Sequence, residues 1–156
     1  MKTLKTLRKL VKLFLFTFAA TLIMVGAAHA AVSCHKINAK GAGQDIGGGI
    51  TQAQIIGGGL LHGTTVGNFA IIGGSSPVFT IQGTVTFTTH QGTLTVTVGG
   101  TFNLAMGNFI ASGPVTAATG KLTNATGTLL FDGVEDLLTG KFVEDVNGLI
   151  CLDLAP

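Results

Sequence analysis

Threonine and apolar residues alternate along the middle of the chain, and this alternation constrains the fold more than any other feature. It is clearest in Thr84-Val85-Thr86-Phe87-Thr88 and in Thr93-Leu94-Thr95-Val96-Thr97-Val98. Successive side chains of a strand point to opposite faces, so this pattern of β-branched residues predicts half-buried strands. No stretch after residue 30 shows convincing helical periodicity. We therefore expect an all-β domain.

The same alternation predicts how neighbouring strands pair, because a slip of one residue would turn every side chain to the other face. Pairing Phe87 with Leu94 and Val85 with Val96 keeps the apolar residues on one side. It leaves a turn at His90-Gln91 with Gly92 free to take a positive φ.

Further turns are expected at the glycines that follow. A loop at Gly99-Gly100-Thr101 would set Val98 opposite Phe102, and a two-residue turn at Gly107-Asn108 would set Met106 opposite Phe109. Residues 77 to about 116 then form a four-stranded antiparallel meander with one apolar face and one threonine face.

The remaining segments predict more strands, at residues 50–56, 60–72, 126–131, 137–143 and 149–154. Turns are expected at Asp132-Gly133 and Asn147-Gly148, and the glycine-rich segments 41–47 and 73–77 are interpreted as loops. The total is about eight strands. The simplest arrangement is a closed antiparallel β-barrel, because closure removes exposed strand edges. A two-sheet β-sandwich is the alternative.

The first 30 residues have the three parts of a secretory signal peptide. Five basic residues lie within residues 1–12, an apolar run spans 13–25, and Ala28-His29-Ala30 follows. An apolar run of this length is shorter than the roughly 20 residues that a membrane-spanning helix needs. We expect cleavage after Ala30, a single domain over 31–156 without a transmembrane segment, and a periplasmic or extracellular location. The lack of Trp and Tyr also argues against a transmembrane barrel, which needs aromatic girdles.

Charge is scarce and unevenly placed in the predicted mature chain. Four lysines against seven acids leave a net charge of −3, and there is no arginine. Nucleic-acid binding is set aside, because it requires clustered Lys or Arg. Residues 46–120 contain no Asp, Glu, Lys or Arg. The exposed side of their strands is therefore expected to be an uncharged, threonine-rich face.

Cys34 and Cys151 are the only cysteines, and an exported chain meets an oxidising compartment. We predict that they form one disulfide, which would place the two ends of the domain side by side. The alternative interprets residues 31–34 as a lipoprotein cleavage box, with Cys34 as a lipid anchor.

Residues 119–127, Thr-Gly-Lys-Leu-Thr-Asn-Ala-Thr-Gly, resemble the T-G-x-aromatic-x-x-A-x-G segment of the allene oxide cyclase and dirigent-like barrels. The resemblance implies an eight-stranded antiparallel barrel with an apolar lumen. Leu122 stands where that family has Phe or Tyr. Dirigent pockets use Asp, Arg and Tyr, and this mature chain has neither Arg nor Tyr, so no catalytic residue is carried over.

The polar residues form no local motif for a metal or a cofactor. His35, His62 and His90 are 27 and 28 positions apart, so no two supply metal ligands from one local segment. Five acids fall near the last two predicted hairpins, but their spacing is not that of a calcium loop, and we interpret them as a solvated acidic end. They are Asp132, Glu135, Asp136, Glu144 and Asp145.

These features favour a non-enzymatic barrel that binds a small apolar molecule in its lumen. The expected lining is Phe79, Ile81, Val85, Phe87, Val96, Phe102 and Leu104. One alternative is a structural or surface-associating protein that uses the threonine face and forms homo-oligomers. The other is a cyclase or isomerase with converging polar groups such as His62 and Asn103.

Overall fold

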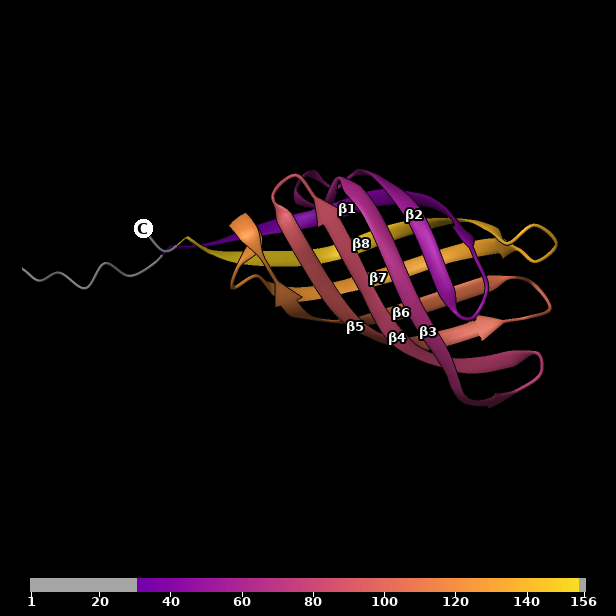
Figure 1. Cartoon of the computed structure of the whole chain (residues 1–156). Coiled ribbons are helices and arrows are strands. Elements are labelled where there is room, and N and C mark those ends of the chain that lie inside the picture. Colours follow the sequence, from indigo (N-terminus) through magenta and orange to yellow (C-terminus); the bar gives the residue numbers. More distant parts are fainter. Residues whose placement is uncertain (1–30, 155–156) are drawn as a thin grey trace, which may run out of the picture. The chain divides into compact units, whose positions relative to one another are not determined.

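Eight antiparallel strands close into a single barrel in a computed structural model that describes residues 31–154. Each strand pairs with the next along the chain, and the last returns to pair with the first (Figure 1). The strands are β1 (Ala31–Asp45), β2 (Ile50–Gly57), β3 (Gly63–Ser75), β4 (Val78–Thr89), β5 (Gly92–Asn103), β6 (Asn108–Ala118), β7 (Thr126–Asp136) and β8 (Lys141–Leu154). The predicted closed barrel is confirmed, and the sandwich alternative is not observed. The predicted signal peptide lies outside the described residues.

The register predicted for the β4–β5 hairpin is confirmed. Val85 pairs with Val96 and Phe87 with Leu94, across a turn at His90-Gln91. The apolar partners are buried inside the barrel, and threonines pair across the outer wall. The hydroxyls of Thr86 and Thr95 lie 3.1 Å apart.

The predicted loop at Gly99-Gly100-Thr101 is wrong. Strand β5 continues through it to Asn103, with Gly100 paired to Ile81 on one side and Ala111 on the other. A Cβ on Gly100 would lie 1.9 Å from the carbonyl oxygen of Ile110, so the two backbones pass too closely for any side chain. Gly100 thus serves close packing of strands in a curved wall rather than a turn.

Other turns predicted from glycine are also wrong, because these glycines lie within strands. Asp132-Gly133 lies within β7 and Asn147-Gly148 within β8, while the hairpin between these strands turns at residues 137–140. Segment 41–45 belongs to β1 instead of a loop. The β5–β6 turn occupies residues 104–107, which leaves Phe102 rather than Met106 opposite Phe109. Residues 78–118 therefore form three long strands and not four short ones.

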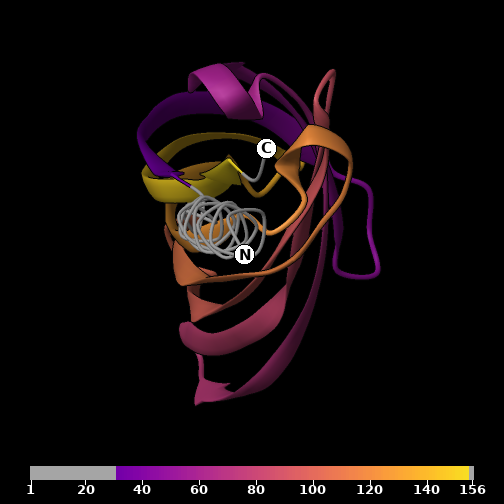
Figure 2. The ribbon, with the colours of Figure 1, turned by 90° about the vertical axis from the view of Figure 1, so that its left-hand side faces the viewer.

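The two ends of the barrel differ. The "closed end" carries the β4–β5 turn, the start of β1, the end of β8 and two 3-10 helices, η1 (Gly59–Leu61) and η2 (Gly120–Leu122). Figure 2 looks along the barrel from this side. The "open end" carries the four other connections, at residues 46–49, 76–77, 104–107 and 137–140. The closed-end connections include helical turns that fold over the strands, whereas the open-end connections are short turns.

The closed half of the barrel is filled by its own side chains. Leu61 from η1 and Leu122 from η2 are both 0% exposed, so each short helix inserts a leucine into this end. They pack with a cluster that includes Ile37, Ile55, Phe87, Leu94, Val96, Leu129, Val146 and Ile150. Packing of this kind leaves little room for a ligand.

Cys34 and Cys151 form the predicted disulfide, as directly opposed residues of β1 and β8. The bond closes a loop with a sequence separation of 117 and ties the first strand to the last at the closed end. Within residues 31–154 we find no helix with the length and hydrophobicity needed to span a membrane.

Candidate functional site

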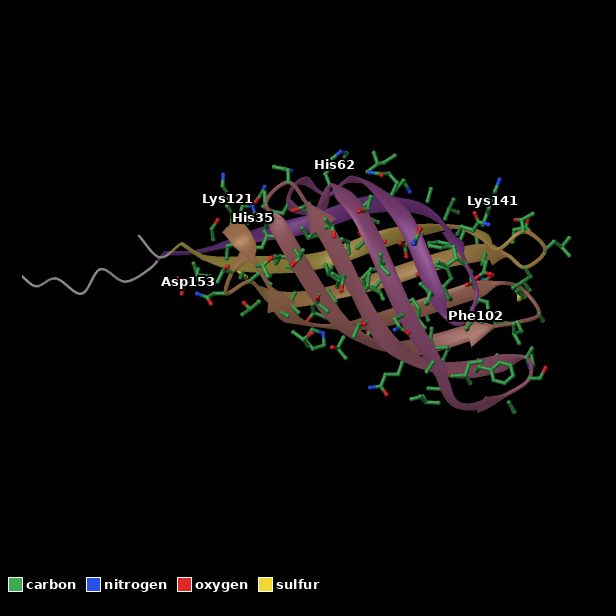
Figure 3. All side chains as sticks on the ribbon, in the orientation of Figure 1. His35, His62, Phe102, Lys121, Lys141 and Asp153 are labelled. Atoms are coloured by element: carbon green, nitrogen blue, oxygen red, sulfur yellow. A yellow bond between two sulfur atoms is a disulfide. The ribbon has the colours of Figure 1, made fainter. Side chains whose placement is uncertain are left out.

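The open half of the barrel contains a cavity of about 210 Å³. Its floor is formed by Val85, Ala111 and Phe131, which cap the packed core below. Its walls come from the ends of the strands that meet the open-end turns. Figure 3 shows Phe102 and Lys141 at this end and His35 at the other. The lining is Asp45, Thr51, Thr65, Phe69, Ala70, Ile71, Ile81, Val85, Phe102, Phe109, Ala111, Phe131, Glu135, Phe142 and Glu144.

Aromatic rings dominate this lining. Five of the seven phenylalanines after residue 30 contribute to it. Phe109 and Phe142 meet edge to face, with ring centroids 5.9 Å apart, a favoured geometry for an aromatic pair. An apolar cavity of ~150 Å³ is large enough to hold benzene. The cavity therefore suits a ligand somewhat larger than a single aromatic ring.

Glycines on the same strand or on an adjacent one make room for the large inward side chains. The Phe142 ring extends to within 2.6 Å of where a Cβ on Gly43 would lie. The Phe69 ring comes similarly close to Gly67 and Gly83. Because these strand positions carry no side chain, the rings occupy space along the wall that a side chain would otherwise fill.

Glu144 points into the barrel, between two glycines. Its neighbours across β8 are Gly41 on β1 and Gly133 on β7. A Cβ on Gly41 would lie 2.6 Å from both Cγ and Oε1 of Glu144, so the carboxylate side chain occupies the space that Gly41 leaves empty. Burial raises the pKa of Glu144 to about 7. Within the apolar wall, the charged form loses much of its hydration.

Two further acids line the cavity near its mouth. Burial raises the pKa of Glu135, and repulsion from the carboxylate of Asp45 raises it further. Asp45 is held by the β1–β2 loop, where its Oδ1 accepts a 2.7 Å hydrogen bond from the Gly47 N–H. Barrel closure brings Asp45, at the end of β1, close to Glu135 of the last hairpin. Glu144 lies deeper in the same cavity, opposite Gly41 of β1.

Two other acids of the predicted acidic end, Asp136 and Asp145, do not line the cavity. Asp145 faces outward and forms a 2.6 Å ion pair with Lys40. Asp136 holds the β7–β8 turn by accepting hydrogen bonds from the Leu138 N–H and the Thr139 hydroxyl, which lower its pKa. Describing all five as a solvated acidic end is therefore wrong for Glu144, which is half-buried and lines the cavity. Among residues 31–154, no three His, Cys, Asp or Glu side chains gather as metal ligands.

The residues that the sequence suggested for the lumen separate into three groups. Ile81, Val85 and Phe102 line the cavity. Phe87 and Val96 are fully buried in the packed closed half. Phe79 is half-buried on β4 opposite Phe102, outside the lining. Leu104 is 45% exposed in the β5–β6 turn, because β5 ends before it.

The suggested pairing of His62 with Asn103 does not occur. His62 is exposed beside η1 at the closed end (Figure 3), and Asn103 ends β5 at the open end. His90 is exposed at the tip of the β4–β5 turn. His35 is also exposed, with its Nε2 3.2 Å from the Ser33 hydroxyl.

The two glutamates of the cavity could have been found from the sequence. Leu129, Phe131, Gly133 and Glu135 alternate along β7, and Phe142, Glu144 and Val146 alternate along β8. Side chains alternate between the two faces of a strand. Once the strands are continued through Asp132-Gly133 and Asn147-Gly148, this alternation therefore assigns both glutamates to the inner face. The predicted turns at those dipeptides interrupted the pattern.

Comparison of the chain with known protein families, curated proteins and solved structures finds no match. The resemblance of residues 119–127 to the allene oxide cyclase and dirigent-like barrels therefore stays a prediction.

Proposed function

We propose that this protein is a non-enzymatic binding barrel that holds one small, largely apolar molecule in the cavity at its open end. The observation that carries the proposal is the contrast between the two halves of one barrel. Leu61 and Leu122 fill the closed half, whereas the phenylalanines of the open half lie against the wall and leave a space of about 210 Å³. A concave, mostly apolar pocket with a few polar groups is the usual form of a small-molecule site.

The proposal is tested by titration with 1-adamantanol, a compact and rigid neutral probe, followed by NMR and calorimetry. We expect saturable binding with stoichiometry one. Ala111→Leu should abolish binding, because Ala111 forms part of the cavity floor. Ala117→Leu is the matched control, since Ala117 lies on the same strand and is exposed. If Ala111→Leu does not fold, Ile81→Phe reduces the cavity from a half-buried wall position. Unchanged binding by the folded cavity variants would contradict the proposal.

A second candidate, surface association, is supported by the outer wall. Thr84 pairs with Thr97 and Thr86 with Thr95, and the Thr97 hydroxyl lies 3.1 Å from that of Thr116. These rows lie within the uncharged segment 46–120. Sedimentation velocity should show association that increases with concentration and is lost in Thr86→Lys/Thr97→Lys. A wild-type protein that stays monomeric throughout would contradict this candidate.

A further inference from the structure

The cavity carries negative charge without a positive partner in its wall. Among the described residues that line it, three are carboxylic acids and none is Lys, Arg or His. A carboxylate in an apolar wall loses hydration, and this cost is relieved when the group takes up a proton or when a partner compensates the charge.

The cations at this end are engaged elsewhere or point away. Lys40 is ion-paired with Asp145 on the outer wall. Lys141 begins β8, is exposed, and pairs in register with Asp136 and Gln44. Neither belongs to the lining of the cavity. A counter-charge for the inward acids would therefore have to arrive with the occupant.

The wall favours an organic cation over a metal ion. Calcium takes 6–8 oxygen ligands and magnesium nearly ideal octahedral coordination. No cluster of metal-ligating side chains occurs among residues 31–154. Phenylalanine rings attract ammonium groups through their faces and also pack against hydrocarbon. Phe109 and Phe142 lie beside the inward glutamates, with the Phe109 ring reaching the space above Gly133 and Phe142 directly opposite Glu135.

We infer that the natural occupant is an organic amine with a compact apolar body, whose ammonium group contacts the Glu144 carboxylate while its hydrocarbon contacts the phenylalanines. This inference rests on the proposed function, because it names the ligand class of the same cavity. Glu144 provides the deepest carboxylate contact, in the space between Gly41 and Gly133. Glu135 and Asp45 add negative charge toward the mouth.

The arrangement also makes amine binding depend on pH. The residues opposite Glu144 on β1 and β7 are glycines, the other carboxylates of the cavity are Glu135 and Asp45, and Thr51 and Thr65 complete its polar lining. The Lys40–Asp145 pair lies on the outer side of the same wall. Below about pH 7 Glu144 becomes protonated and loses its attraction for an ammonium group. Affinity for an amine should therefore fall as the pH decreases from 8 to 5.

The test uses three probes that share one rigid body: 1-aminoadamantane, 1-adamantanol and adamantane-1-carboxylate. At pH 8 the amine should bind at least about tenfold more tightly than the alcohol, as expected for a charge-assisted hydrogen bond, and the carboxylate should bind most weakly. Glu144→Gln should remove most of the advantage of the amine over the alcohol. Asp145→Asn, one residue away and facing outward, should preserve it.

The outcomes separate the ligand class from the proposed function. If the alcohol binds as tightly as the amine, or the carboxylate binds most tightly, the amine inference fails while the apolar cavity site stands. If none of the three probes binds, the proposed function fails together with the inference. If Glu144→Gln keeps the full preference for the amine at pH 8, Glu144 does not hold the ammonium group and the inference is overturned.

Discussion

Replacing Glu144 with glutamine should stabilise the protein at alkaline pH and leave it unchanged in acid. Burial raises the pKa of this side chain from 4.5 to about 7. Between these values the folded protein holds a proton that the unfolded chain has lost, so stability falls as the pH rises through that window and levels off above it. At about 1.4 kcal/mol per pH unit, ionised Glu144 lowers the free energy of unfolding by about 3 kcal/mol. A neutral glutamine avoids this cost.

The assay is urea unfolding of wild type and Glu144→Gln at pH 4 and pH 8.5. The variant should exceed the wild type by about 3 kcal/mol at pH 8.5 and match it at pH 4. Asp145→Asn is the control on the same strand, and loss of its exposed ion pair with Lys40 should change stability by no more than about 1 kcal/mol at either pH. The reasoning is refuted if Glu144→Gln shows the same difference from wild type at both pH values.

Three further predictions concern the barrel itself. Gly100→Ala should destabilise the protein by about 1–3 kcal/mol, because its Cβ would strike the Ile110 backbone. Gly99→Ala should be tolerated, because the nearest atom to its Cβ would be 4.0 Å away. Thermal melts of the two variants test this. Reducing the Cys34–Cys151 bond should cost up to about 4–5 kcal/mol, measured by urea unfolding with and without reductant; identical midpoints would contradict it. Leu61→Ala should cost about 2–5 kcal/mol in the same assay, and a loss below 1 kcal/mol would mean that the closed end is not tightly packed.

The fold class and the register of one hairpin could be predicted from the sequence because they depend on local patterns. Val85, Phe87, Leu94 and Val96 lie close together along the chain, and a slip of one residue would turn one strand's pair outward. The short turn at His90-Gln91 then selects the observed register. Gly100 shows where this reasoning fails. A glycine that permits close approach of two strands and a glycine that makes a turn give the same local signal, and only the neighbouring strand distinguishes them.

The cavity depends on long-range closure of the barrel, so its lining could be predicted from the sequence only in part. Ile81, Val85 and Phe102 belong to the central hairpin, so their inward direction follows from the period-two pattern. Asp45 approaches Glu135 of the last hairpin only because β8 returns to β1. The division between a packed half and a hollow half could not be predicted from the sequence. It depends on which turns insert side chains such as Leu61 into the barrel.

The central claim is that one barrel is solid at its closed end and hollow at its open end. The most direct test is to measure intermolecular nuclear Overhauser effects between bound 1-adamantanol and assigned side chains of the protein. We expect contacts to Ile81, Phe102 and Phe109, which line the cavity, and none to Val96, which is buried in the closed half. Contacts confined to outward residues such as Val66, or no contacts under saturating probe, would contradict the claim.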